Sequence, residues 1–397
     1  MTLVLNTEEV VQALDAQGYI EAMEEAFTEL GHGAAINSPR TETGIPLLKY
    51  GTAEGVKKKA RKLLRALPEG ADPQQSKAWM RAAKETEELN YRLKTIVGGY
   101  PKCGIMALKI DSTTDTNPSL DGMKRSVKLP LGSGWRYTGM MLLFDIVTGE
   151  LQAILPLGPL QRNRVAATSA VGVKHLARKE AKTLGLFGSG FQAEGQLAYA
   201  SLVRQLKNVK VFSPNADHRK SFAERMERAV GVEVIPVEKP EEVCRNADIV
   251  VSATTSLTPV FQAKWLDEGT HLGSINIVEA DRASFDRSDV VVVNARPFSG
   301  GSDLVRDYVM GKKMDTVGSN INKKSKKLDW QAMRELGELV TGKIKGRKSE
   351  AQITFHCNNI GLGIQHAATG SRILANARRL GLGKEIPTDW FLQKEHT

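Results

Sequence analysis

The chain has 397 residues, of which 41% are hydrophobic and 25% charged, and its 55 basic and 45 acidic residues give a formal net charge of +10. At roughly 150 residues per domain this length favours two or three domains, and the composition excludes a disordered or fibrous chain. No run of about 18 uncharged apolar residues is present, which excludes a transmembrane helix. Glu8 and Glu9 stand where a signal peptide has its apolar stretch, so we expect a cytoplasmic protein without a membrane partner.

Cysteine spacing and the basic runs exclude further classes. Cys103, Cys244 and Cys357 are far apart and form no Cys-x-x-Cys pair, so neither a disulfide framework nor a zinc site is expected. The basic runs at 57–65 and 323–327 contain no aromatic residues. We therefore interpret them as solvated surface and predict no nucleic-acid partner. His356 lies next to Cys357 without further ligands at metal spacing, so we predict no metal.

The first part of the chain mixes helices and strands. Apolar spacing predicts a helix over 6–30, capped by Thr7, and a strand over 105–110 that places Lys109 on the same face as Ile105 and Ala107. The remaining elements predicted for this part are an insertion of two charged helices at about 56–94, broken at Pro68 and Pro73, a polar loop at 111–118, a strand at 139–147 and a helix at 161–178.

Strands and helices alternate from residue 181 onward. The predicted strands are 183–187, 209–212, 232–235, 248–253, 271–275 and 290–293, and the helices are 191–205, 217–229 and 240–246. Repeated βα units of this length indicate an α/β protein with a doubly wound parallel sheet. A helix predicted over 361–380 then returns to the first domain.

A glycine turn gives the most specific local signal. The strand ending at Phe187 runs into Gly188-Ser189-Gly190-Phe191-Gln192-Ala193 and then into a helix. Gly188 permits the tight turn, Gly190 lets the backbone approach a pyrophosphate, and Ala193 allows close packing of helix on strand. Free N–H groups at the helix start favour phosphate binding. We predict a dinucleotide site made by these residues and by Thr254, which follows a later strand.

The end of the second strand of this domain bears on the choice of cofactor. An NAD-binding protein has an acidic residue about 20 residues after the glycines, whereas this chain has Ser213 followed by Pro214 and Asn215. Ser213 and Asn215 are able to donate to a 2′-phosphate, and Arg219 adds positive charge. The pattern favours NADP(H), and NAD(H) stays open.

Several motifs together resemble a known family. They are Ser38-Pro39-Arg40, Ala107-Leu108-Lys109, Asp145-Ile146-Val147-Thr148-Gly149-Glu150, Arg164-Val165-Ala166-Ala167-Thr168-Ser169-Ala170, the glycine turn, Ala247-Asp248-Ile249-Val250 and Gly269-Thr270-His271. This combination is similar to the ornithine cyclodeaminase and mu-crystallin family, which includes NADPH-dependent ketimine reductases and alanine dehydrogenases. The resemblance covers most of the chain apart from the insertion.

The resemblance implies an α/β domain of residues 1–178 with 350–397 that binds substrate and forms a homodimer, and a Rossmann domain of residues 179–349. It also implies that Arg40 and Arg164 hold a substrate carboxylate and that Lys109 lies at the reacting imine or amine. These roles are chemically apt, because a guanidinium binds a carboxylate bidentately and an ammonium donates a proton.

One position departs from the family pattern. The catalytic aspartate of the cyclodeaminases corresponds to Val278 here, and Glu279 or Asp281 are candidate substitutes. We therefore predict an NAD(P)H-dependent oxidoreductase that reduces an imine beside a carboxylate or oxidises the matching amino acid. Two alternatives are a redox-neutral cyclodeaminase with bound NAD, which releases ammonia, and a non-catalytic NADPH-binding protein of the crystallin type.

Overall fold

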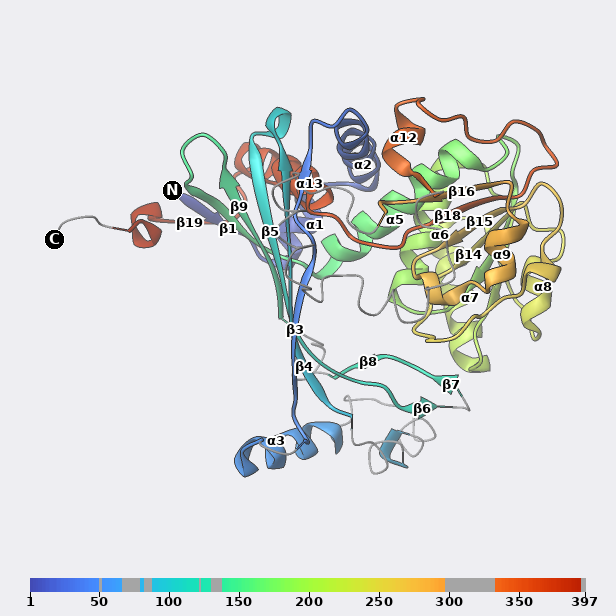
Figure 1. Cartoon of the computed structure of the whole chain (residues 1–397), viewed down its shortest axis with the longest axis horizontal. Helices are drawn as coiled ribbons and strands as arrows, with labels where there is room; N and C mark the ends of the chain where they lie inside the picture. The colour runs from blue at the N-terminus through green and yellow to red at the C-terminus, as the bar shows by residue number, and fades with distance from the viewer. Residues whose placement is uncertain are drawn as a thin grey trace.

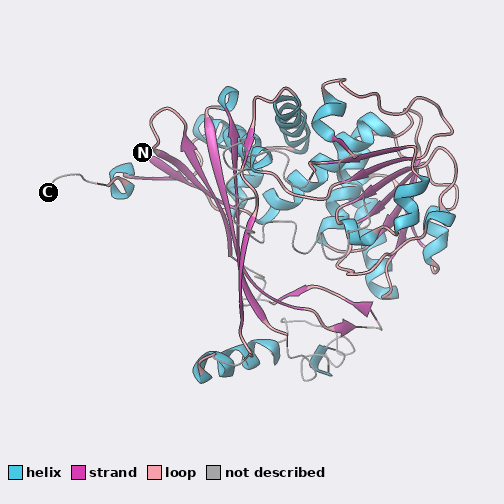
Figure 2. Cartoon of the chain, viewed as in Figure 1, coloured by secondary structure: helices cyan, strands magenta, loops and turns pink. Residues whose placement is uncertain are grey.

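The computed structural model describes residues 1–49, 52–65, 79–81, 88–120, 123–129, 138–296 and 333–393. Two large sheets organise them, and helices pack on both (Figures 1 and 2). The first sheet has the order β19-β1-β10-β9-β5-β4-β2, with β3 paired to β4 and β8 to β5. Its strands are β1 (Thr2–Val4), β2 (Ile36–Asn37), β3 (Thr41–Pro46), β4 (Asn90–Tyr100), β5 (Ile105–Thr116), β8 (Val127–Lys128), β9 (Thr138–Asp145), β10 (Leu151–Pro156) and β19 (Lys384–Ile386).

Helices cover the face of the first sheet that is turned towards the second (Figure 1). They are α1 (Thr7–Ala13), α2 (Ala16–Gly31), α5 (Gly158–Leu176) and α13 (Gly363–Leu380). The helix predicted at the C-terminus is thus confirmed and packs on β4, β5 and α2. The opposite face of β5 and β9 keeps a set of half-buried apolar side chains: Met106, Leu108, Ile110, Met140, Leu142 and Phe144.

The helix predicted over 6–30 was wrong in two respects. It is two helices, because the Asp15 side chain accepts a hydrogen bond from the N–H of Gly18 (2.8 Å) and begins a second helix. The first helix is capped by Asn6, whose Oδ1 accepts from the N–H of Glu9 (2.9 Å), rather than by Thr7.

Two further predictions in the first part need correction. Residues 90–94 of the predicted helical insertion begin β4, and 111–116 of the predicted loop continue β5. Of the two insertion helices, α3 (Glu54–Arg65) is present, whereas 66–78 and 82–87 lie outside the described residues. The loop was predicted because 111–116 is polar. It is a strand because β4 pairs with residues 111–115 and β8 with residues 115 and 116.

The second sheet is parallel and has the order β13-β12-β11-β14-β15-β18-β16-β17. Its strands are β11 (Thr183–Phe187), β12 (Asn208–Phe212), β13 (Glu233–Pro236), β14 (Ile249–Ser252), β15 (His271–Ser274), β16 (Val290–Val293), β17 (Arg334–Glu335) and β18 (Thr354–Cys357), and its helices include α6 (Phe191–Val203), α7 (Ala216–Val230), α8 (Pro240–Cys244), α9 (Arg282–Arg287) and α12 (Leu336–Val340). The chain order reverses between β11 and β14, the switch point at which doubly wound sheets bind ligands. Residues 354–357, which we assigned to the first domain, belong to this sheet as β18.

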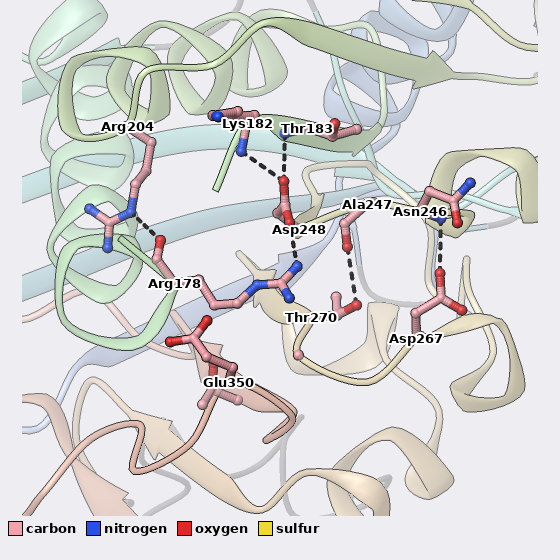
Figure 3. Close-up of polar contacts among 12 residues, drawn as sticks. Arg178, Lys182, Thr183, Arg204, Asn246, Ala247, Asp248, Asp267, Thr270 and Glu350 are labelled. Carbon is pink, nitrogen blue, oxygen red and sulfur yellow. Dashed lines mark hydrogen bonds and ion pairs between the residues drawn. The ribbon is translucent and has the colours of Figure 1, made fainter. Parts of the chain in front are cut away.

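Asp248 connects the end of α5 to the amino ends of β11 and β14 (Figure 3). Its carboxylate accepts hydrogen bonds from the N–H groups of Lys182 (2.7 Å) and Thr183 (2.9 Å) and pairs with Arg178. Burial opposes the charge, but these donors outweigh it and hold the pKa of Asp248 below its usual value. The network fixes the amino ends of these strands. The glycine turn lies at the opposite edge of the sheet, at the carboxyl ends.

Candidate active site

Strand β5 places Lys109 in the interior of the first domain. Its side chain shares a face with Ala107 and Asp111, as the period of two requires, and it is 4% exposed. The ammonium group pairs with the carboxylate of Asp111, which is also buried. Burial lowers the pKa of Lys109 to about 8, Asp111 opposes that shift, and Arg164 and Arg40 add to it. Lys109 therefore changes its charge close to neutral pH.

Arg164 reaches the same region from α5. Its Nη1 donates to Oε1 of Gln365 on α13 (3.0 Å), and Nε2 of Gln365 donates to the Thr168 hydroxyl (2.6 Å). A Cβ at Gly361 would lie 2.9 Å from both terminal guanidinium nitrogens. The guanidinium is therefore held by α13 and by the turn before it, within electrostatic range of Lys109.

Helix α13 crosses the first sheet directly over β5. A Cβ at Gly363 would lie 2.2 Å from the backbone N of Gly98 on β4, and one at Gly370 would lie 2.6 Å from Leu143 on β9. Because β5 lies between these strands and residue 366 shares a helix face with 363 and 370, His366 faces β5. Its ring is fully buried, and neither nitrogen has a hydrogen-bond partner among the described residues.

His366 is held neutral at this place. Burial lowers its pKa well below the usual value, and the nearby charges of Arg164 and Lys109 add to that effect. A neutral imidazole with two unused nitrogens beside Lys109 is suited to hydrogen bonding with a ligand. Our sequence reasoning missed both His366 and Asp111, and the available signal for Asp111 was its spacing of two from Lys109.

Arg40 lies between β2 and β3 and is partly exposed. Its guanidinium pairs with Glu42 (2.9 Å), and Glu42 also pairs with Arg92 (2.6 Å) and Lys94 (3.6 Å). Arg40 lowers the pKa of Lys109, so the two charges are close. Arg164 and Arg40 thus both lie within electrostatic range of Lys109.

The glycine turn has the geometry of a phosphate site. Gly188 has φ +111°, and a Cβ there would lie 2.4 Å from the carbonyl oxygen of Ala253. Space is open beside Gly190, and no side chain caps α6, which begins at Phe191. Ala193 is fully buried. The backbone N–H groups at this helix start are therefore available to a pyrophosphate.

Ser213 closes the far side of the turn at the end of β12. Its hydroxyl contacts the Ser189 hydroxyl (2.9 Å), and its carbonyl accepts from Nη1 of Arg219 (2.5 Å). Asn215 caps α7 by accepting from the N–H of His218 (2.8 Å). Phe191 is exposed, and the Arg162 guanidinium lies 4.6 Å from the centre of its ring. Gln192 follows on the first turn of α6.

Glu279 lies near the end of β14, on the side of the second sheet where the glycine turn lies, rather than in the group around Lys109. Its carboxylate accepts from the N–H (2.5 Å) and the hydroxyl (2.6 Å) of Thr254 and from the hydroxyl of Ser252 (3.2 Å). Within the described part of the chain, no contact joins Glu279 to Lys109. Burial raises its pKa to about 7, against the hydrogen bonds from Thr254.

The arrangement combines a dinucleotide turn with a buried lysine and two arginines. Residues 133–379 match the Ornithine cyclodeaminase/mu-crystallin family. The chain belongs to this family. It is 28% identical over 258 residues to a Delta(1)-pyrroline-2-carboxylate reductase of Bacillus cereus, covering 62% of this chain and 74% of that protein. It is 27% identical over 248 residues to an alanine dehydrogenase of Archaeoglobus fulgidus, covering 62% and 73%.

A solved structure agrees with this assignment of the ornithine cyclodeaminase/mu-crystallin family. Delta(1)-pyrroline-2-carboxylate reductase of Thermococcus litoralis, in complex with NADH and L-proline, has a TM-score of 0.71 and 25% identity over 97% of this chain and 100% of its own. The predicted family, the Rossmann fold and an NAD(P)-dependent oxidoreductase acting on C=N or CH–NH groups are confirmed.

Both candidate substitutes for the cyclodeaminase aspartate, Glu279 and Asp281, have hydrogen-bond partners in the structure. Val278 lies in a short turn of 3₁₀ helix, Ile277–Glu279, and Glu279 is turned to Thr254. Asp281 caps α9 by accepting from the N–H of Ser284 (2.9 Å). In the described residues, no group of three or more metal-ligating side chains occurs, and no helix is long and apolar enough to cross a bilayer.

Proposed function

We propose that this protein reduces a ketimine, a C=N bond adjacent to a carboxylate, with NADPH as the preferred donor, and oxidises the corresponding amino acid in reverse. The observation that carries the proposal is the buried Lys109 with two guanidinium groups, those of Arg164 and Arg40, within electrostatic range. A substrate that neutralises Arg164 and Arg40 with its carboxylate brings its nitrogen next to Lys109. The relatives named as pyrroline-carboxylate reductase and alanine dehydrogenase act on such substrates.

In this account Arg164 binds the substrate carboxylate, since Gln365 already orients its guanidinium. A bound carboxylate accepts charge-assisted hydrogen bonds there. Arg40 adds a second positive charge within electrostatic range of Lys109, and in this proposal its guanidinium exchanges Glu42 for the substrate carboxylate. Holding the substrate in this way orients it for hydride transfer, which is one of the contributions a protein makes to the chemistry of a cofactor.

Lys109 holds the proton that the reaction needs. The bound dinucleotide supplies a hydride to the imine carbon, and the nitrogen takes a proton. Lys109 donates that proton from Nζ, and Asp111 stabilises the ammonium form beforehand. In the reverse direction the neutral amine of Lys109 accepts the proton. A pKa of about 8 makes both forms accessible at neutral pH.

The glycine turn, α6 and Thr254 are proposed to hold the dinucleotide. Ser189 and Ser213 meet at the edge where the adenosine ribose of such cofactors lies. Residue 213 is a serine instead of a carboxylate, and Arg219 is held by the carbonyl of Ser213. A 2′-phosphate therefore meets no repulsion at this edge. This charge pattern supports NADPH over NADH.

The proposal also includes a homodimer formed through the uncovered face of the first sheet. The apolar side chains of β5 and β9 on that face, Leu142 and Phe144 among them, are half-buried within one chain. A second copy that pairs with the same face would bury them. Leu142→Glu should yield a monomer by light scattering, whereas Leu380→Glu, at the exposed end of α13, should not. A stable wild-type monomer at micromolar concentration would contradict this part.

A cytoplasmic location completes the proposal. Cys103, Cys244 and Cys357 are all free thiols, which fits a reducing compartment. Fractionation of cells that express the protein tests it, and recovery from a secreted or membrane fraction would overturn it.

The activity is tested with a panel of cyclic and open-chain imines next to a carboxylate, including Δ1-pyrroline-2-carboxylate, supplied with NADPH or NADH. The expected result is consumption of reduced cofactor in equal amount to the amino acid formed. Ammonia release from a diamino acid without net cofactor consumption would instead identify a cyclodeaminase. Tight NADPH binding without turnover on any member would favour the non-catalytic alternative.

A further inference from the structure

Three histidines are buried in the described part of the chain, and they differ in what their rings contact. Nδ1 of His271 on β15 lies 3.0 Å from the Thr354 hydroxyl, and Nε2 of His356 on β18 lies 3.0 Å from Oδ1 of Asn294. Neither ring nitrogen of His366 on α13 has a hydrogen-bond partner among the described residues. Because buried polar atoms in native proteins are nearly always paired, the His366 ring indicates a place for a polar ligand or an ordered water.

Two glycines of α13 fix the part of the first sheet over which His366 lies. A Cβ at Gly370 would lie 2.9 Å from Cε of Met141, the β9 residue that is paired with Lys109. Gly363 lies against the backbone of β4, on the other side of β5. His366 is three residues from one glycine and four from the other, so all three share a helix face. Its ring therefore faces β5 on the side of the sheet that carries Lys109.

Two positive charges act on the ring. Burial lowers the pKa of His366 most, and Arg164 and Lys109 both lower it further. The ring is thus neutral at neutral pH, with one N–H donor and one acceptor nitrogen. It offers a ligand a hydrogen bond rather than a charge, and the proton of the reaction stays with Lys109.

A second unused polar atom lies two residues further along β5. The ammonium group of Lys109 pairs with Oδ2 of Asp111, whereas Oδ1 has no hydrogen-bond partner in the part of the chain that the structure describes. A carboxylate accepts hydrogen bonds and donates none. A ligand atom at Oδ1 therefore carries a proton, as the nitrogen of an amine or a protonated imine does. The carboxylate of the same ligand then belongs with the donors, Arg164 and His366.

We propose that one ring nitrogen of His366 donates a hydrogen bond to the substrate carboxylate and shares this group with Arg164. Gln365 holds the guanidinium (3.0 Å), and the next residue of the same helix supplies the additional donor. A carboxylate has enough lone pairs for a bidentate guanidinium and a further N–H group. The inference rests on the proposed function, because it concerns the one group that all substrates of that reaction share.

This role predicts opposite effects on the ligand-free and the bound protein. Without ligand the polar ring is buried with no protein partner, so an apolar side chain of similar size should not destabilise the fold. In the bound protein the same change leaves a carboxylate oxygen without its donor. His366→Leu should therefore keep or raise the midpoint of thermal unfolding and weaken carboxylate binding. His271→Leu, which removes a buried contact to Thr354, should lower the midpoint and leave the affinity of the folded protein unchanged.

Binding of two unreactive or product-like carboxylates tests the contact without turnover. The NADPH-loaded protein is titrated with pyrrole-2-carboxylate, a planar ring that is not reduced, and with L-proline. We expect at least 10-fold weaker binding of both in His366→Leu. His366→Gln, which retains an N–H donor, should stay within threefold of the parent. NADPH affinity should be the same in all variants. Binding of neither probe by the parent, or equal losses in His366→Leu and His366→Gln, would overturn the proposal.

Kinetics with an imine that the protein reduces separate this role from that of Lys109. The carboxylate contact is the same in the ground state and the transition state, so His366→Leu should raise KM at least 10-fold and lower kcat less than threefold. Unchanged affinity and KM in His366→Leu, with or without a lower thermal midpoint, would overturn the contact and leave the reductase intact. Binding of the probes through His366 without reduction of any imine would uphold the contact and refute the proposed function.

Discussion

Lys109 and Asp111 form an ion pair on one face of a single strand, and both residues are at most 6% exposed. A buried pair of this kind costs desolvation that the attraction between its members only partly returns. Its retention next to two arginines and an unpartnered histidine is understandable if the pair sets the protonation of Lys109 for the reaction.

The pH dependence of reduction should report this pair. Burial lowers the pKa of Lys109 to about 8, and the reduction requires the ammonium form. The kcat/KM for imine reduction should therefore fall above about pH 8, and that for amino-acid oxidation should rise over the same range. Asp111→Asn removes the charge that raises this pKa. The fall of kcat/KM for reduction and the rise of kcat/KM for oxidation should therefore both move to lower pH. Profiles of the variant and the parent that coincide would exclude Lys109 as the titrating group.

Arg164→Ala should weaken substrate binding rather than cofactor binding. Loss of a charge-assisted bidentate contact is worth on the order of 2–4 kcal/mol, which corresponds to roughly 30- to 1000-fold in kcat/KM. NADPH affinity should remain as in the parent. Arg379→Ala, on the exposed side of α13, is the matched control. Unchanged kinetics in Arg164→Ala would move the carboxylate site elsewhere.

Ser213→Asp should change the cofactor preference. The wild type should bind NADPH more tightly than NADH, and the new carboxylate should repel the 2′-phosphate and accept the ribose hydroxyl. The expected shift towards NADH is roughly 1–3 kcal/mol, the scale of a hydrogen bond to a charged group. Fluorescence titration measures it, with Ser221→Asp on the exposed face of α7 as control. Tighter NADH binding by the wild type would refute the NADP preference.

Glu279→Gln should alter how stability depends on pH. The pKa of Glu279 is raised from 4.5 to about 7 in the folded state, so the folded chain binds a proton that the unfolded chain has released between these values. The contribution of Glu279 to the free energy of unfolding should therefore fall as pH rises from 4.5 to 7, by about 3 kcal/mol at most. The variant should lack this contribution, and Glu268→Gln, which is exposed, should keep it. If the free energy of unfolding changes with pH in the same way in the wild type, Glu279→Gln and Glu268→Gln, all measured at the same protein concentration, the assignment is contradicted.

The parts predicted well from sequence were those with strong local signals. β11 and the start of α6 follow the glycine pattern. The period of two placed Lys109 on the same face as Ile105 and Ala107, and the structure buries that face. The strand at 111–116 was missed because its inward face carries the polar residues Asp111, Thr113 and Asp115. A buried strand face is expected to be apolar, so this polar stretch was predicted to be a loop. β1 and β19 are three residues each, too short for a periodic signal.

Relationships between distant segments explain the remaining misses. His366 faces β5 only because α13 crosses the sheet above that strand, which no local pattern reveals. The catalytic role of Glu279 stays a prediction, and only the fold shows that Ser252 and Thr254, at the end of β14, donate hydrogen bonds to its carboxylate. β18 was placed in the wrong domain because it follows the basic segment ending near 347 and precedes the returning helix.

The transfer of hydride itself tests the central claim most directly. The protein is given NADPH carrying deuterium at the transferable C4 position and an imine that it reduces, and the amino acid is analysed by mass spectrometry and NMR. The account predicts one deuterium at the carbon next to the carboxylate, in a single configuration, and loss of this product by at least 100-fold in Lys109→Met with NADPH affinity retained. Product without deuterium, or undiminished transfer by Lys109→Met, would contradict it.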